Sequence, residues 1–173
     1  MSHPLVMALF ADVAAAAAAA RGVHLLGVDR SDLSVVARDH ADEGRIADQI
    51  QGSPGSEIED SPSASRLGQL SGYILAAIAI GLPGTGAVVA AGPLAAELGE
   101  VAGHVAGQVA GDLKATLIKA GMTEPDADAW RAQVEGGRAI LLGVHARNAR
   151  VSEIETVLRE HSTGPVVHTQ WAD

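Results

Sequence analysis

The apolar and polar positions of this chain divide it into two similar ends and a different middle. Residues 5–10 form a short apolar run that predicts a strand buried on both faces. An alanine-rich helix over 14–20 follows; Asp12 is expected to cap it and Gly22 to end it. Residues 33–37 predict a second strand, so the N-terminal end reads as a βαβ unit.

The C-terminal end repeats this order after one extra helix. Thr123 is a typical N-cap, and the helix that it begins should end at Gly136 and Gly137. A strand is predicted over 138–146, an amphipathic helix over 148–161, and a closing strand with alternating polarity over 165–171. These three elements make a second βαβ unit.

The middle of the chain has a different composition. Residues 39–65 are rich in acids, Gly, Ser and Pro and are typical of a flexible linker. No charged residue then occurs from Leu67 to Ala96. We expect this stretch to begin a helical hairpin with arms at about 66–80 and 87–120 and with Pro93 near the start of the second arm. Its turn is predicted at Gly81, Pro83, Gly84 and Gly86.

Four glycines in the second arm recur at every fourth position: Gly99, Gly103, Gly107 and Gly111. Such residues return to nearly the same helix face and leave a groove that another helix can enter closely. The groove can serve packing within the hairpin or onto the sheet, self-association, or contact with a membrane. Polar residues along the same arm argue against deep burial in lipid.

Two split βαβ units predict a ferredoxin-like α+β sandwich, a four-stranded antiparallel sheet with helices on one face and a glycine-rich helical hairpin inserted between the halves. The expected divisions are 1–38 for the first half, 39–65 for the linker, 66–121 for the glycine-zipper hairpin, and 122–173 for the helix and second half. The open apolar face of such a sheet needs a cover. Dimerisation and the insertion are the two candidates.

Several segments resemble a family of small bacterial general stress proteins, described as heat-induced or low-temperature-induced. They are Val6-Met-Ala-Leu-Phe-Ala-Asp, Asp32-Leu-Ser-Val-Val-Ala-Arg, Gly84-Thr-Gly-Ala-Val-Val-Ala-Ala-Gly-Pro-Leu and Glu135-Gly-Gly-Arg-Ala-Ile-Leu-Leu-Gly-Val. The resemblance covers nearly the whole chain except the acidic linker. It implies a role in stress and lends no reaction and no catalytic residue.

Composition narrows the classes of partner. A net charge of −9 disfavours nucleic acid and anionic lipid, which both attract basic surfaces. The 173 residues include no cysteine, so a disulfide framework and a thiolate site are excluded. The first residues lack the basic segment of a secretory signal, and we expect a cytoplasmic protein, with membrane association as the alternative.

Candidate chemistry is sparse. Glu100 and His104 stand four residues apart on one helix and can share a cation, while His145 and His168 lie on predicted strands whose exposed faces could bring them together. The default for these histidines is a solvated or hydrogen-bonded side chain. The glycine-rich turn lacks the lysine of a phosphate-binding loop, and no nucleophile motif occurs. No cofactor and no catalytic residue is predicted.

We therefore expect a non-enzymatic stress-response protein that acts by association, as a homodimer. Two alternatives stay open. One is a peripheral membrane protein whose Leu67–Ala96 segment contacts lipid, and the other is a module that binds a small ligand or a metal.

Overall fold

The computed structural model describes residues 2–38, 78–82, 86–101, 112–147 and 150–172. Its strands form one six-stranded antiparallel sheet in the order β3-β4-β2-β5-β1-β6. The strands are β1 (Ser2–Phe10), β2 (Leu33–Arg38), β3 (Ile78–Leu82), β4 (Gly86–Ala91), β5 (Ile140–His145) and β6 (Val167–Ala172). The fold is thus mixed α and β, as the sequence predicts.

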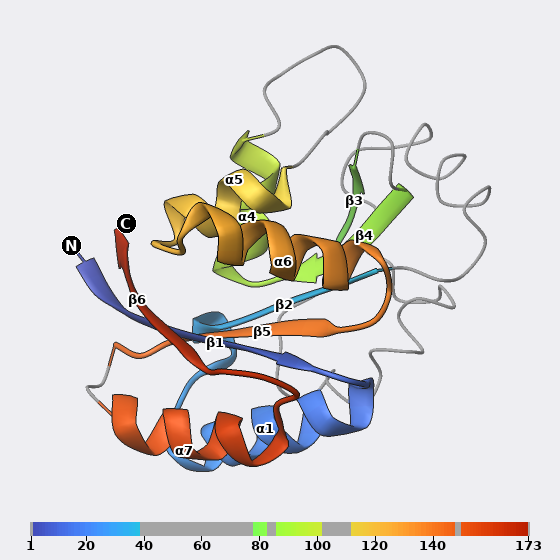
Figure 1. Cartoon of the computed structure of the whole chain (residues 1–173). Coiled ribbons are helices and arrows are strands. Elements are labelled where there is room, and N and C mark those ends of the chain that lie inside the picture. Colours follow the sequence, from blue (N-terminus) through green and yellow to red (C-terminus); the bar gives the residue numbers. More distant parts are fainter. Residues whose placement is uncertain (1, 39–77, 83–85, 102–111, 148–149, 173) are drawn as a thin grey trace.

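Helices cover both faces of this sheet. They are α1 (Val13–Leu25), α4 (Pro93–Val101), α5 (Leu113–Lys119), α6 (Glu124–Glu135) and α7 (Val151–His161), and a short 3-10 turn, η1 (Arg30–Asp32), precedes β2. In Figure 1, α1 and α7 lie below the sheet, and α4, α5 and α6 lie above it. The expectation of helices on one face only is wrong, because α4, α5 and α6 supply a second layer.

Alternation along the central strand β1 explains the two layers. Val6, Ala8 and Phe10 belong to the core shared with α1 and α7. Leu5, Met7 and Leu9 belong to the core beneath α4, α5 and α6. Since successive side chains of a strand point to opposite faces, a continuous apolar run requires cover on both.

The strand and helix starts at the two ends follow their sequence signals. The Asp12 side chain accepts a hydrogen bond from the Ala15 N–H at 2.8 Å, and Thr123 accepts one from the Asp126 N–H at 3.4 Å. The first helix, however, does not end at Gly22 but continues to Leu25. A Cβ at Gly22 would lie 2.5 Å from Val157 Cγ1, so this glycine allows α1 to approach α7 closely.

The predicted helical hairpin is wrong where the structure describes it. Residues 78–82 and 86–91 are strands that pair with each other from Ile78↔Ala90 to Leu82↔Gly86, and β4 pairs in turn with β2. Isoleucine and valine at these positions favour an extended backbone, and an apolar run without periodicity does not distinguish helix from strand. Of the residues predicted in the turn, Gly81 lies in β3 and Gly86 is the first residue of β4, while Pro83 and Gly84 lie outside the described residues.

The second expected arm is broken as well. Gly92 separates β4 from α4 with a φ of +79°, and Pro93 is the first residue of α4. Gly99 lies in α4, and Gly103, Gly107 and Gly111 lie outside the described residues together with the acidic linker 39–65. The glycine groove therefore stays a prediction.

Gly92→Ala tests the junction between sheet and second helical layer. A Cβ there would lie 2.0 Å from the Leu33 carbonyl oxygen, in addition to the strain of a positive φ. We expect a loss of about 3 kcal/mol or more in the free energy of unfolding, measured by urea denaturation.

Gly27→Ala is the matched control, because Gly27 also has a positive φ, +88°, but beyond its chain neighbours no atom of the described residues lies within 4 Å of its Cβ position. It should lose only about 1–2 kcal/mol. Equal losses for the two variants would contradict the close approach of Gly92 to β2.

Candidate functional site

The strand register brings two histidines together beneath the second helical layer. His145 at the end of β5 is opposite Leu5 of β1, and His3 precedes Leu5 by two residues on the same face. On the other side of β1, Trp171 of β6 is opposite His3. His3, His145 and Trp171 are all buried, with exposed fractions of 8%, 1% and 7%.

A chain of hydrogen bonds links these histidines to helix α4. The Leu94 N–H, in the first turn of α4, donates to Ser34 Oγ at 3.0 Å. Ser34 Oγ lies 3.3 Å from His145 Nε2, and His145 Nδ1 lies 2.9 Å from His3 Nε2. The Trp171 ring meets His145 edge-on, with ring centroids 5.2 Å apart.

Two proton arrangements of neutral histidines satisfy this chain, because the Ser34 oxygen can accept a second hydrogen bond besides the one from Leu94. In one, Ser34 donates to His145 Nε2, and His145 Nδ1–H donates to His3 Nε2. In the other, His3 Nε2–H donates to His145 Nδ1, and His145 Nε2–H donates to Ser34 Oγ. In either arrangement the hydrogen bonds join α4, β2, β5 and β1.

The order serine, histidine, histidine also resembles the relay of a nucleophilic enzyme. Ser34, however, is fully buried, and α4 begins directly over it, with Leu94 Cδ1 3.0 Å from the Cβ position of Gly143. A nucleophile must meet its substrate, whereas this hydroxyl is buried and lies in hydrogen-bond contact with the Leu94 N–H and His145. The arrangement is suited to fastening the second helical layer to the sheet.

His145 and His168 do not come together as expected. His168 of β6 is opposite Val6, and His145 is opposite Leu5, so the two rings lie on opposite faces of the sheet. His168 is half-exposed and lies 3.5 Å from Glu155 of α7. Their partners on β1, Leu5 and Val6, are adjacent and point to opposite faces, so the two histidines are separated by the sheet. Only the strand register reveals this.

The predicted metal ligands do not form a group in the described part of the chain. Glu100 lies in α4 and His104 lies outside the described residues. Within the described ranges, no three His, Asp or Glu side chains are close enough together to hold a metal ion.

A partly buried ion pair joins α4 to α5. Glu97 Oε1 lies 2.5 Å from Lys119 Nζ, and the Glu97 side chain is only 9% exposed while that of Lys119 is 57% exposed. Lys119 therefore brings a solvated positive charge to a carboxylate that is itself almost fully buried. The pair fixes the two helices on each side of residues 102–111.

Two acids of α6, Asp128 and Glu135, have pKa values shifted in opposite directions. Burial raises the pKa of the Glu135 carboxyl, and the charge of Asp112 adds to this while Arg131 and Arg38 oppose it. A hydrogen bond from Lys114 lowers the pKa of Asp128, with a smaller contribution from the charge of Arg131.

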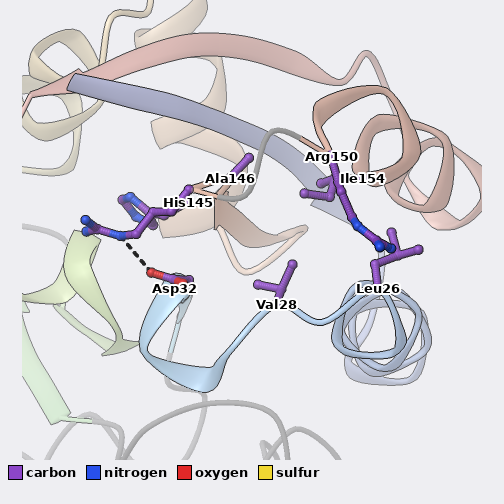
Figure 2. Close-up of a pocket in the computed structure, with 8 residues that line it drawn as sticks. Leu26, Val28, Asp32, His145, Ala146, Arg150 and Ile154 are labelled. Carbon is purple, nitrogen blue, oxygen red and sulfur yellow. Dashed lines mark hydrogen bonds and ion pairs between the residues drawn. The ribbon is translucent and has the colours of Figure 1, made fainter.

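A small cavity lies on the other face of the sheet, between the end of α1, the turn η1 and the start of α7. Its volume is about 10 Å³, the space of one water molecule. Figure 2 shows Asp32 and Arg150 at its rim, with the ion pair between Asp32 Oδ1 and Arg147 Nε, 2.8 Å long. This volume admits no organic ligand.

Comparisons with protein-family models, curated proteins and solved structures find no match. In the described residues, no helix is both long enough and apolar enough to cross a membrane.

His145→Ala tests the hydrogen-bond chain. It removes both histidine bonds and leaves a void beneath α4, so we expect a loss of about 2–4 kcal/mol in the free energy of unfolding, measured by urea denaturation. His168→Ala, the matched change on the opposite face, should stay within about 0.5 kcal/mol of the wild type. Small losses in both variants would contradict a fastening role for His145.

Glu135→Gln and Asp128→Asn should show opposite pH dependence. A raised folded pKa means that the contribution of Glu135 is present below its unfolded pKa and lost as pH rises through the folded pKa. Glu135→Gln should therefore gain stability relative to the wild type between about pH 4 and pH 7.

Asp128 has a lowered folded pKa, so its contribution is present above the unfolded pKa and lost as pH falls through the folded one. Asp128→Asn should destabilise the protein at neutral pH, and the difference should vanish in acid. Urea denaturation across this pH range measures both, and parallel curves for the two variants would refute the assignment.

Proposed function

We propose that this chain is a non-enzymatic general stress-response protein that acts through self-association. The observation that carries the proposal is the position of β3, which forms one edge of the six-stranded sheet. An edge strand presents backbone N–H and C=O groups along its outer side, and these pair readily with another strand.

The two edges of the sheet differ in the features that oppose such pairing. The β6 edge carries exposed His168 and Gln170 and follows Pro165. The β3 edge has the sequence Ile-Ala-Ile-Gly-Leu, without a charge or a proline. Natural sheets blunt their edges with polar and charged side chains and with proline, so β3 is the edge suited to association.

The chemistry of the described site supports a non-enzymatic role. Its serine and histidines are buried and bonded to one another, and their bonds hold α4 on the sheet. The part in stress responses rests on the resemblance to the general stress protein family alone.

We also propose a specific fold for the two ends of the chain. The strands β2-β5-β1-β6, with α1 and α7 as their crossovers, have the order of a ferredoxin-like split βαβ sandwich. On this assignment the segment from β3 to α6 is an insertion that widens the sheet and covers its second face.

We also propose that the predicted glycine groove packs against a second helix, as a further contact within one copy or between two copies. A cytoplasmic location is proposed as well. The alternative is contact of the uncharged segment 67–96 with a membrane surface. The experiment must distinguish this contact from self-association.

Ala79→Lys tests the proposal by placing a charge on the β3 edge. The wild type should elute with a light-scattering mass of twice the 17.6 kDa chain. Ala79→Lys should raise the protein concentration needed for dimerisation at least about ten-fold, which is equivalent to about 1.4 kcal/mol. Gln170→Lys, on the β6 edge, should behave as the wild type.

The same chromatography is repeated with vesicles of neutral phospholipid. A monomer that co-elutes with vesicles would replace the proposal by the membrane alternative. A wild-type monomer at every concentration, without lipid binding, would refute association.

A further inference from the structure

The strand pairing of β3 and the lack of charge in its sequence limit the kind of partner that this edge can bind. All five residues of β3 pair with β4 on the inner side, from Ile78↔Ala90 to Leu82↔Gly86. On the outer side, no strand of the described part of the chain pairs with β3. An occupant of this edge must therefore supply an extended backbone.

The distribution of charge along the chain favours one kind of partner for the β3 edge. The chain has a net charge of −9, so two copies repel each other over most surfaces. The segment from Leu67 to Ala96 is free of charge, and both strands of the hairpin, β3 and β4, lie within it. Two copies that meet at β3 avoid facing like charges, while a basic or acidic partner gains nothing there.

We infer that β3 of one copy pairs antiparallel with β3 of a second copy, about a two-fold axis at Ile80, to form one continuous sheet across the dimer. This inference rests on the proposed self-association and adds its interface and register. An antiparallel strand pair is self-complementary under two-fold symmetry, so each copy satisfies the outer N–H and C=O groups of the other.

The axis at Ile80 fixes which residues face each other. Ile80 is the third of the five residues of β3, so it lies opposite its own counterpart, and Ile78 lies opposite Leu82. Directly opposed residues of an antiparallel pair have Cα atoms about 4.5–5.5 Å apart and side chains on one face, a spacing that fits a disulfide. The two Leu82 residues, in contrast, are about 13 Å apart along the strands.

The chain contains no cysteine, so a single introduced thiol reports on this geometry without interference. Under mild oxidation, full-length Ile80→Cys should form a covalent dimer at least ten-fold faster than Leu82→Cys, the off-axis variant, and Gln170→Cys, on the β6 edge. Melting of each variant under reducing conditions checks that it folds.

Ala79→Cys covers the case in which Ile80→Cys fails to fold. On the proposed axis the two Ala79 residues are diagonal neighbours about 7–8 Å apart, within reach of a short bifunctional thiol reagent. The Gln170→Cys pair should resist the same reagent.

The outcomes separate this inference from the proposed function. A light-scattering dimer that cross-links faster at Gln170→Cys than at Ile80→Cys overturns the β3 interface, and one that cross-links faster at Leu82→Cys overturns the register about Ile80; either result leaves self-association standing. A monomer at all concentrations overturns both.

Discussion

Burial of both faces of the sheet is the constraint on which the rest of this structure depends. The central strand β1 is apolar at successive positions, and Leu5 and Val6 point into different cores. One layer of helices, α1 and α7, covers one face, and the second face requires α4, α5 and α6. Gly92, Ser34 and the ion pair of Glu97 with Lys119 fix that second layer. Most of the polar chemistry in the described core thus serves its attachment.

The elements that could be predicted from the sequence are those whose apolar pattern fits only one type of secondary structure. The strands around Val6, Leu33 and Leu141 and the helix that begins after Thr123 lie where the apolar runs and the N-cap indicate. Residues 78–91 are open to two interpretations, because an apolar run without charge or period suits a buried helix or a strand equally. Pairing of β4 with β2 decides between them, and that contact spans some fifty residues of sequence.

The candidate site could be predicted only in part, for the same reason. His145 is recognisable as a histidine on a strand, but its partner His3 is separated from it by 142 positions. Neither has a spacing motif, and the register of β1 with β5 alone brings them to one face. The one signal for His3 in the sequence is its position two residues before Leu5, on the same face of the predicted strand. The opposite placement of His145 and His168 likewise depends on one residue of register.

We have proposed that the uncharged edge of the sheet, β3, pairs with a second copy of the chain. Hydrogen–deuterium exchange of the β3 amides as a function of protein concentration tests it most directly, because pairing protects the outward-facing amides of residues 78–82 only in the associated state. If β3 pairs in this way, the protection of its amides rises with protein concentration, together with the dimer fraction, while the β6 amides keep one exchange rate. Exchange in β3 that is independent of concentration, in a sample that does dimerise, would contradict it.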